Sequence, residues 1–369
     1  MRSKLKIALV HDWLTDFGGA ERVLFVLHEL YPEAPIFTSF FRPENLPQFR
    51  DADVRVSYLQ KIPFAKNHHR FFYPFMPAAI EQFDFSEFDL VISTTSSGCA
   101  KGIITNPDTI HICYCHNPSR VLWDGSQEYL NLHNLNFLTR KLLPRQLMKL
   151  RIWDRCAADR VDYFLANSKF VARRIQKYYQ REAKVIYPPV EVKNFEPAEE
   201  KPKDYFLAVG RLIPYKRFDL VIAAANVLGV KLRIVGTGSE EKKLKAIAGS
   251  TVRFFGKVSD SILQKMYAEC QALVFPQVED FGLAPVEANA SGRPVIAFED
   301  GGALETIVPN RTGIFFREQS VDSLSDAMQK VRKMKWVKKS IVKNAQRFDV
   351  KRFKEKIFEV VEEVVFQSR

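Results

Sequence analysis

Short apolar runs alternate with longer amphipathic segments along the whole chain. Residues 5–10 predict a buried strand, and the helical pattern after them opens at Ala20 and stops at Pro32. One face of that helix carries Val23, Leu24, Val26, Leu27 and Leu30. The further strand candidates are residues 36–40, 54–59, 89–93, 110–115, 163–167 and 184–187. This rhythm predicts a parallel sheet with helices on both faces.

A proline-rich segment then interrupts the pattern. Residues 187–204 hold four prolines and several charges without an apolar period, which is typical of an interdomain linker. The rhythm restarts after it, with a helical pattern at 218–228 and an amphipathic helix over 344–369. The second set of strand candidates is 205–210, 232–236, 252–256, 272–276, 294–298 and 313–316.

The chain is therefore expected to be an α/β protein of two doubly wound, Rossmann-like parallel-sheet domains that face each other across a cleft. We place the first domain at residues 1–190 and the second at 191–345. A C-terminal helix over 346–369 is expected to cross back to the first domain. A length of 369 residues with 46% hydrophobic and 27% charged residues suits two globular domains of this kind.

The chain carries a formal net charge of +12, which favours phosphates, nucleic acid or an anionic membrane surface as partners. No nucleic-acid-binding module is recognised, so we expect no nucleic-acid partner. The five cysteines show no Cys-x-x-Cys pair and are expected to be buried free thiols in a reducing cytosol. Apolar runs are too short to span a bilayer. We expect a cytoplasmic protein that touches the membrane from the inside.

Ligands of open α/β sheets bind beyond the carboxyl ends of the strands, so the turns after the strands are the places to search. The first such turn contains Gly18 and Gly19 and opens a helix, where backbone N–H groups can approach a phosphate. The alternative is a tight turn that requires a positive φ. The first turn of the second half holds Arg211 and Lys216, which suit a diphosphate. The alternative is a pair of surface cations.

The segment EDFGLAPVE, residues 279–287, places two glutamates eight positions apart around apolar residues and a glycine. Gly282 frees the backbone, and the proline suits the first turn of a helix. Glu287 is expected in that first turn, where it accepts hydrogen bonds from a ribose diol, while Glu279 faces the other end of the same ligand. The alternative is a capping glutamate and a surface glutamate. The backbone amides expected to face an anion are those of Phe281, Gly282, Leu283 and Ala284.

Four motifs in this order resemble the retaining family 4 glycosyltransferases, which have the GT-B fold. They are GGAER at 18–22, GRLxxxK at 210–216, GxGxE at 236–240 and the two glutamates of 279–287. The resemblance covers nearly the whole chain. It implies a nucleotide-sugar co-substrate and no cofactor or metal, because two protein cations neutralise the leaving nucleoside diphosphate.

The resemblance also implies roles for single residues. Arg211 and Lys216 would stabilise the leaving diphosphate, Glu287 would bind the ribose, and Glu279 would contact the donor sugar. His116 matches a histidine that contacts the transferred sugar, although a histidine at a strand end is by itself more often structural. Retention would follow from attack on the same face as the leaving phosphate, without a protein nucleophile. The turns expected to hold phosphate, sugar or nucleobase contain Gly18, Gly19, Gly236 and Val258.

Two segments combine basic and aromatic residues. Residues 61–77 hold three Lys or Arg, two His and no acid among many aromatic residues, and residues 136–155 mix basic residues with Leu, Phe and Trp. Such segments suit an anionic interface. The alternative is an ordinary core stripe with a solvated basic face. We expect a lipid-linked or glycan acceptor and contact with an anionic membrane.

The donor is inferred from resemblance alone. Residues 11–24, 37–41 and 115–120 look most like mannosyltransferases of O-antigen and other surface-polysaccharide pathways, which implies GDP-mannose. A UDP-hexose is the competing donor. A nucleotide-sugar epimerase is a second enzyme class, and a basic polyanion-binding protein is the non-catalytic alternative.

Overall fold

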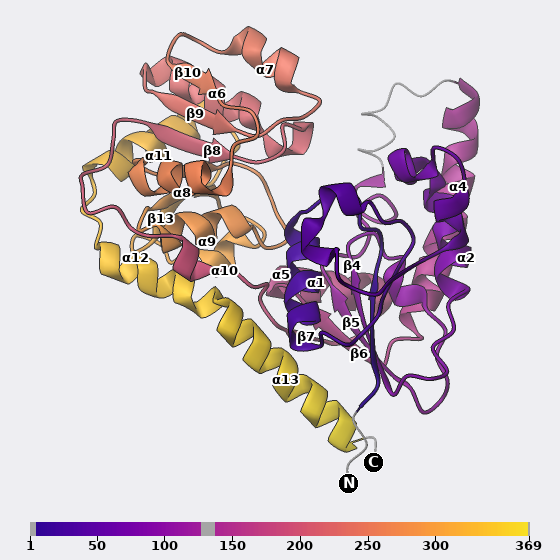
Figure 1. The fold of residues 1–369 in the computed structure, drawn as a ribbon. Coiled ribbons are helices and arrows are strands. Elements are labelled where there is room, and N and C mark those ends of the chain that lie inside the picture. Colours follow the sequence, from indigo (N-terminus) through magenta and orange to yellow (C-terminus); the bar gives the residue numbers. More distant parts are fainter. Residues whose placement is uncertain (1–4, 127–136, 368–369) are drawn as a thin grey trace. The chain divides into compact units, whose positions relative to one another are not determined.

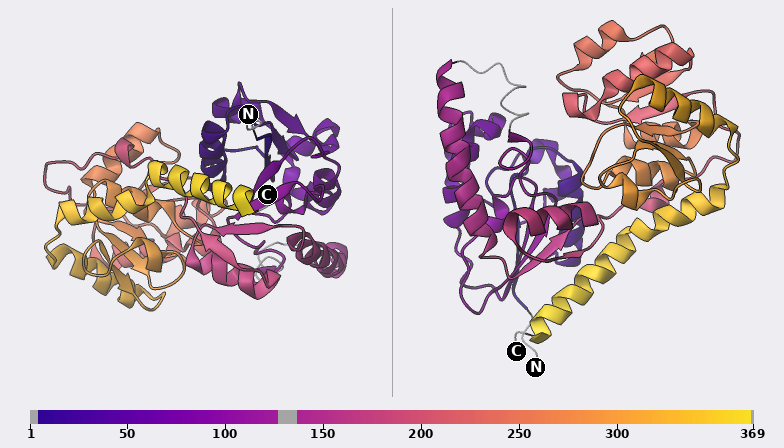
Figure 2. Two further views of the ribbon diagram at one scale, coloured as in Figure 1. Left: turned by 90° about the horizontal axis from the view of Figure 1, so that it is seen from below. Right: turned by 180° about the vertical axis from the view of Figure 1, so that it is seen from behind.

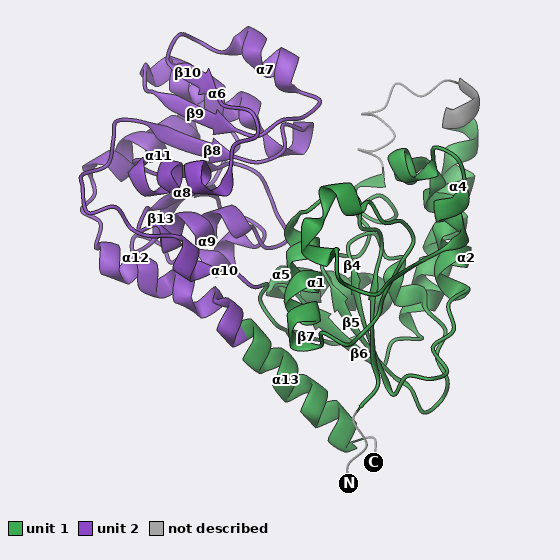
Figure 3. Ribbon diagram, in the orientation of Figure 1, with its two compact units in different colours: residues 1–188, 353–369 green, residues 189–352 purple. Residues whose placement is uncertain are grey.

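The computed structural model describes residues 5–126 and 137–367, which form two compact units (Figure 1 and Figure 3). Unit 1 comprises residues 1–188 and 353–369, and unit 2 comprises residues 189–352. Each unit contains one all-parallel sheet. The expected α/β class with two doubly wound sheets is therefore confirmed.

The sheet of unit 1 has seven strands in the order β3-β2-β1-β4-β5-β6-β7. The chain order reverses between β1 and β4, which pair in register from Ile7 with Leu90 to His11 with Thr94. A crevice for a ligand opens at such a reversal. The strands are β1 Ile7–His11, β2 Ile36–Thr38, β3 Val54–Val56, β4 Leu90–Thr95, β5 Ile110–Cys115, β6 Tyr163–Ala166 and β7 Ala183–Val185.

Helices and 3-10 turns connect these strands. Helix α5 begins after Ser168, whose hydroxyl accepts a hydrogen bond from the backbone N–H of Val171 and so caps the helix. The helices of unit 1 before the linker are α1 Gly19–Leu30, α2 Met76–Glu81, α4 Phe137–Ala158 and α5 Lys169–Tyr179. The short 3-10 helices are η1 Pro43–Asn45, η2 Pro47–Phe49, η3 Tyr58–Lys61, η4 Ala65–Asn67, η5 His69–Phe75 and η6 Ala100–Gly102.

The strand expected over residues 54–59 is shorter than the sequence predicts. It ends at Val56, because Ser57 caps the 3-10 helix η3 by accepting a hydrogen bond from Leu59 N–H at 3.2 Å. The Ser57 hydroxyl also donates to the Ser39 carbonyl at 2.9 Å. The side chain of Ser57 therefore competes with the sheet for this backbone.

The sheet of unit 2 has six strands in the order β10-β9-β8-β11-β12-β13. Successive residues of β8 enter two different apolar clusters, since Phe206 and Ala208 belong to one and Leu207 to the other. Both faces of this sheet are therefore covered, as expected for a parallel sheet. The strands are β8 Phe206–Val209, β9 Leu232–Val235, β10 Val252–Phe254, β11 Leu273–Phe275, β12 Val295–Phe298 and β13 Gly313–Phe316.

The predicted helix over 218–228 forms as α6, Phe218–Leu228, and ends at Gly229, which has a left-handed conformation with φ 62°. Glycine adopts this conformation without the steric cost of a side chain. The other helices of unit 2 are α7 Glu241–Ile247, α8 Asp260–Glu269, α9 Leu283–Ala290, α10 Ala303–Thr306, α11 Val321–Lys333 and α12 Lys338–Ala345. Its 3-10 helices are η7 Val192–Asn194, η8 Pro214–Lys216 and η9 Gln346–Phe348.

The single helix expected from residue 344 is wrong, because the chain breaks at residues 346–349. Helix α12 ends at Ala345, η9 follows, and helix α13 runs from Val350 to Gln367 (Figure 2). The break buries Phe348, and Val190 bonds to the backbone on both sides of Asp349, at 2.9 Å and 3.2 Å. The hydrogen bonds of Val190 and the burial of the Phe348 ring stabilise the non-helical backbone at this break.

From Phe353 onward helix α13 packs on unit 1. The Phe353 ring lies 5.8 Å from the Tyr114 ring, and Lys354 forms an ion pair with Glu29. Four of the five cysteines are buried as expected, but Cys156 on α4 is exposed. Within the described ranges, the helices are all too short or too polar to cross a membrane.

Candidate functional site

The carboxyl edge of the unit 2 sheet brings together the two motifs that the sequence places 63 positions apart. Lys216 ends η8 in the turn after β8, and Glu279 lies in the turn after β11, the strand beside β8. Their side chains form an ion pair and are only 14% and 19% exposed. The pair therefore sits where the chain order of this sheet reverses, the position at which open α/β sheets bind ligands.

Three glycine-containing turns stack along the same edge. Leu212 N–H donates to the Thr237 carbonyl at 2.9 Å, and Gly236 N–H donates to the Gly256 carbonyl at 2.8 Å. Gly236 has φ 133°, and a Cβ there would lie 1.9 Å from the Gly210 carbonyl oxygen. The turns that carry Arg211, Gly236 and Val258 are thus held close by backbone contacts that only glycine permits.

Arg211 and Lys216 differ in their surroundings although they share one turn. The Arg211 side chain is exposed, whereas Lys216 is mostly covered by its own turn and by Glu279. Arg217, next to Lys216, has φ 52° and binds Asp219 and Gln319 through its guanidinium group. These bonds fix the end of η8 and hence the position of Lys216.

Glu287 is buried, with 6% of its surface exposed. It lies on α9, and its Oε2 accepts a hydrogen bond from the Tyr267 hydroxyl at 2.9 Å. The helix begins at Leu283, so Glu287 lies in the second turn, not in the first as the sequence suggested. Tyr267 is a positioning residue for this carboxylate that sequence analysis missed, because it comes from a different helix, α8.

The turn before α9 has the open backbone that was expected. Gly282 has φ 86° and a Cβ there would meet the Phe275 ring at 2.9 Å. The Gly301-Gly302 pair after β12 packs against the backbone of this turn, and Gly302 N–H donates to the Glu279 carbonyl at 2.8 Å. Sequence analysis did not include these two glycines, although a glycine pair directly after a strand was a visible signal.

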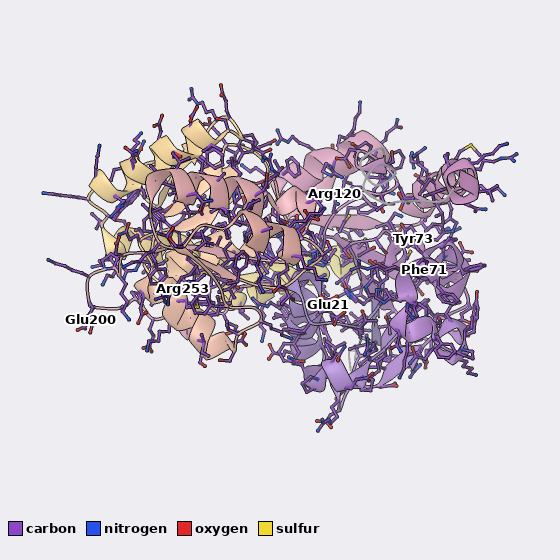
Figure 4. The ribbon with its side chains drawn as sticks, turned by 90° about the horizontal axis from the view of Figure 1, so that it is seen from above. Glu21, Phe71, Tyr73, Arg120, Glu200 and Arg253 are labelled. Atoms are coloured by element: carbon purple, nitrogen blue, oxygen red, sulfur yellow. The ribbon has the colours of Figure 1, made fainter. Side chains whose placement is uncertain are left out.

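In unit 1, His11 at the end of β1 is the centre of a buried polar chain. Its Nδ1 lies 2.6 Å from the Thr94 hydroxyl, and its Nε2 lies 3.4 Å from Glu21 Oε1. Glu21 also accepts a hydrogen bond from Gly18 N–H at 2.9 Å. Figure 4 labels Glu21 among the side chains. Sequence analysis gave no role to His11, and Glu21 entered only as part of the GGAER motif, since only the fold shows that the two side chains meet.

The Glu21 carboxylate therefore occupies the N-terminus of α1, the place expected to hold a phosphate. Burial opposes ionisation of Glu21, yet the hydrogen bond and charge of His11 hold its pKa below the usual value. Gly18 has φ −129°, so the alternative of a turn that requires a positive φ is wrong. A Cβ at Gly18 would instead meet Glu21 Oε2 at 3.0 Å.

His116 follows β5 at the same edge of the sheet and is 8% exposed. Its backbone N–H donates to the Thr95 carbonyl at 2.8 Å, which fixes the residue beside β4. Burial, together with the smaller effect of the neighbouring His11, lowers the pKa of His116 to about 4. The Nε2 atom is buried and has no hydrogen-bond partner among the described residues. At neutral pH this imidazole is uncharged and can donate or accept one hydrogen bond.

Each unit thus gathers its own share of the predicted residues. Unit 1 joins the Gly18-Gly19 turn and His116 at one edge of its sheet, with His11 and Glu21 between them. Unit 2 joins the 210–216, 236–238 and 279–287 segments at one edge of the other sheet. The chemistry of the second set is that of an anion site next to two carboxylates.

Comparisons with known proteins agree with this division. Residues 17–194 match the family model described as Glycosyltransferase Family 4, and residues 190–348 match Glycosyl transferases group 1. A solved structure, HepE of Anabaena in complex with UDP and glucose, aligns with a TM-score of 0.71 at 20% identity and covers 97% of this chain and 100% of that one. At that identity the likeness concerns the fold alone.

Two curated relatives are mannosyltransferases. The GDP-mannose-dependent alpha-(1-6)-phosphatidylinositol monomannoside mannosyltransferase of Mycobacterium tuberculosis is 33% identical over 140 residues, which is 33% of this chain and 36% of that protein. Alpha-1,3/1,6-mannosyltransferase ALG2 of Kluyveromyces lactis is 26% identical over 280 residues, 60% of this chain and 52% of that protein. The chain spans about half the length of the curated relatives it matches.

Two doubly wound parallel sheets, each in its own unit, define the GT-B class of glycosyltransferase folds. The two family models run in order from residue 17 to residue 348. Residues 17–194 are thus similar to the family 4 glycosyltransferases, and residues 190–348 are similar to the glycosyl transferases of group 1.

Proposed function

We propose that the protein is a retaining glycosyltransferase that moves a hexose from a nucleotide sugar to a lipid-linked glycan acceptor, with GDP-mannose as the first candidate donor. The observation that carries this proposal is the meeting of Lys216 and Glu279 at the carboxyl edge of the unit 2 sheet. A cation there can bind the phosphates of a nucleotide sugar, and a carboxylate beside it can bind the hydroxyls of the sugar.

The donor is assigned to unit 2 residue by residue. Arg211 and Lys216 take the diphosphate, together with the backbone amides of Phe281, Gly282, Leu283 and Ala284. Glu287 takes the ribose hydroxyls in the orientation that Tyr267 imposes. Glu279 takes hydroxyls of the transferred sugar. The base lies against the turns of Gly236 and Val258, which backbone bonds keep together.

The chemical step requires stabilisation of the departing diphosphate. Breaking the bond between the anomeric carbon and the phosphate oxygen leaves negative charge on the diphosphate, which Arg211 and Lys216 lower in energy as fixed cations. The acceptor hydroxyl attacks from the same face and passes its proton to the leaving phosphate, so configuration is retained without a protein nucleophile. These two cations do the work that a metal ion does elsewhere, so transfer should continue in EDTA.

We assign His116 the contact with the transferred sugar. Its lowered pKa keeps the ring neutral at pH 7, and its buried Nε2 has no partner among the described residues. A sugar hydroxyl would supply that partner and remove the cost of a buried unsatisfied nitrogen. Glu21 would hold the nearby Gly18 N–H until a ligand replaces it.

Mannose is the first candidate because two relatives are a GDP-mannose-dependent mannosyltransferase and an alpha-1,3/1,6-mannosyltransferase. A UDP-hexose is the second candidate, because the HepE structure contains UDP and glucose. A thermal-shift series with GDP, UDP and ADP and their sugars separates the two, since a tight ligand raises the melting temperature by mass action. The acceptor is proposed to be lipid-linked, because the name of one relative includes a phosphatidylinositol monomannoside. We place it at the cytoplasmic face of the membrane.

Transfer of labelled mannose from GDP-mannose to a membrane lipid extract tests the proposal. Lys216→Ala and Glu287→Ala should each abolish transfer, while Lys335→Ala and Glu318→Ala, both exposed in unit 2, should keep it. Folding is checked by circular dichroism. Full activity in Lys216→Ala and Glu287→Ala would refute the site. Binding that ignores all nucleotide diphosphates and falls steeply with salt would identify a polyanion-binding protein instead, and turnover of the sugar nucleotide without transfer would identify an epimerase.

A further inference from the structure

Trp13, in the turn after β1, differs from the other tryptophans of the chain in its hydrogen bonding. In the other three the indole N–H donates to a protein oxygen: Trp123 to Asp154 at 2.8 Å, Trp153 to Glu81 at 2.8 Å and Trp336 to the Val331 carbonyl at 3.0 Å. The Trp13 N–H has no acceptor among the described residues, although its half-buried ring packs on the core of unit 1. Trp13 therefore presents a free donor on a packed aromatic base, and such a donor is suited to a ligand.

Both neighbours of Trp13 are fixed by hydrogen bonds. Asp12 is 1% exposed, and its carboxylate accepts a hydrogen bond from Ser97 N–H at 2.8 Å. Leu14 N–H donates to the Phe40 carbonyl at 2.7 Å. The backbone of Trp13 is thus held in place before a ligand arrives, which lowers the entropy cost of binding one.

The ring that contacts Trp13 is that of His69, and the two ring centroids lie 5.2 Å apart. Burial and, to a smaller extent, the charge of Arg70 lower the pKa of His69, while Asp16 acts in the opposite direction. The imidazole is therefore uncharged at neutral pH and has one donor and one acceptor nitrogen. The influence of Asp16 also shows that its carboxylate lies near this pair of rings.

Asp16 supplies a carboxylate with unused accepting capacity. The residue is exposed; one of its oxygens lies 3.5 Å from the Thr15 hydroxyl and the other 3.4 Å from the Asn45 amide nitrogen, at the long limit of a hydrogen bond. Phe17, the next residue, has 37% of its surface exposed. A free donor, a free acceptor and an exposed ring together match a pyranose, whose hydroxyls donate and accept and whose C–H groups are apolar.

The charges around these residues do not select an anion. Arg70 and Asp16 act on His69 with opposite signs. Arg42, which also acts on His69, forms an ion pair with Glu44 at 3.3 Å. An uncharged sugar therefore fits this surface better than a phosphate or a sugar carboxylate, which Asp16 would repel.

We propose that Trp13, Asp16, Phe17 and His69 form a subsite for an uncharged pyranose of the acceptor glycan. We call these four residues the pyranose subsite. The Trp13 N–H donates to one hydroxyl, and the Asp16 carboxylate accepts from a second. The Phe17 ring covers the C–H face of the sugar, and His69 holds the Trp13 ring by packing against it.

This inference rests on the proposed function, in which His116 contacts the transferred sugar. The hydroxyl that attacks that sugar must lie beside it, so the acceptor has to bind near His116. His11, two positions before Trp13 at the end of β1, lies 3.4 Å from Glu21 and influences the pKa of His116. The pyranose subsite therefore follows directly on the residues of unit 1 that are assigned to the transfer.

Magnetic resonance of the full chain with isotope-labelled tryptophan tests the subsite. The indole N–H groups give one signal each, and Trp13→Phe identifies the signal of Trp13. Neutral methyl hexopyranosides (the mannoside, glucoside and galactoside) should move this signal and slow the exchange of its proton with water. The signals of Trp123, Trp153 and Trp336 should stay in place, because protein oxygens already hold their N–H groups.

Two variants separate the contributions of the donor and the acceptor. Trp13→Phe keeps a ring and removes the N–H, and should weaken pyranoside binding about three- to tenfold in saturation-transfer measurements. Asp16→Asn removes the charge and should weaken the binding about tenfold. The matched controls, Trp336→Phe in unit 2 and the exposed Asp51→Asn before β3, should leave it unchanged. Folding of each variant is checked by its remaining indole signals.

Anionic probes and kinetics complete the test. Methyl glucuronide and inorganic phosphate should move the Trp13 signal less than the neutral pyranosides do, and an equal response to either anion would overturn the proposal. Wild-type pyranoside binding by both variants would overturn it as well. In the transfer assay both variants should raise the acceptor KM by the factor found for pyranoside binding. A loss of kcat with an unchanged acceptor KM would show a structural role instead.

Donor binding distinguishes this inference from the proposed function. Both variants should keep the thermal shift caused by GDP or UDP, because the pyranose subsite lies in unit 1 and the donor residues lie in unit 2. A chain that binds pyranosides at Trp13 but no nucleotide would refute the proposed function alone. A chain that binds nucleotide but shows no change at Trp13 with any of the neutral pyranosides would refute the pyranose subsite alone.

Discussion

Replacement of Glu279 by glutamine should tighten the binding of a nucleoside diphosphate while it slows sugar transfer. In the ligand-free protein, Glu279 neutralises Lys216. In the proposed function a nucleotide sugar satisfies both partners, because its phosphates would bind the lysine and its hydroxyls would bind the carboxylate. A nucleoside diphosphate has no sugar beyond the phosphates. It takes the lysine and leaves a carboxylate beside its own negative charge.

The size of the effect follows from the geometry of the pair. Unit charges about 3 Å apart interact by about 5 kcal/mol at an effective dielectric constant of about 20. The two side chains are 14% and 19% exposed, so solvent screens them less than a surface pair. Desolvation and rearrangement offset most of that energy, and we expect about 1.4 kcal/mol to remain, which is a tenfold change in Kd.

Calorimetric titration of GDP and UDP into the wild type, Glu279→Gln, Lys216→Ala and the double variant measures the coupling. Glu279→Gln should bind the diphosphate about tenfold more tightly, and Lys216→Ala should bind it more weakly. In the double variant the gain from glutamine should disappear. Glu318→Gln, which removes an exposed charge in the same unit, should leave the affinity unchanged. Equal or weaker diphosphate binding by a folded Glu279→Gln protein would refute the reasoning.

Two further predictions concern stability. Burial lowers the pKa of His116 to about 4 from an ordinary value of 6.5, so between these pH values the unfolded chain binds more protons than the folded chain. The contribution of His116 to the free energy of unfolding is therefore complete above pH 6.5 and falls by up to about 1.4 kcal/mol per pH unit down to about pH 4. Urea unfolding of His116→Gln should lose this part of the pH dependence. Gly236→Ala should cost about 3 kcal/mol or more in thermal unfolding, because its Cβ meets a backbone carbonyl oxygen at 1.9 Å, whereas Gly229→Ala, with φ 62° and open space, should cost only about 1–2 kcal/mol.

Local pattern was enough to locate the framework of both units. Every strand candidate of the sequence corresponds to a strand of one of the two sheets, because strand formation depends on short apolar runs that the sequence displays directly. The predicted element boundaries are wrong where a side-chain hydrogen bond or a residue distant in the sequence determines where an element ends. Ser57 ends β3 early by capping η3, and Val190 bonds to the backbone on either side of Asp349 where a continuous helix was expected.

The sequence by itself determined which turns lie at the carboxyl edge of each sheet, because residues after a strand reach the same edge of a parallel sheet whatever the rest of the chain does. Only the tertiary structure decided which of them touch. Lys216 contacts Glu279, and Tyr267 contacts Glu287, across different elements of the fold. The burial that keeps His116 uncharged likewise comes from elements distant in the sequence. Such contacts depend on strand order and packing, and neither of these produces a pattern that can be recognised in the sequence. The exposure of Phe64 and Phe71 is of the same kind, since the sequence shows an aromatic residue but only packing shows that its ring stays in water.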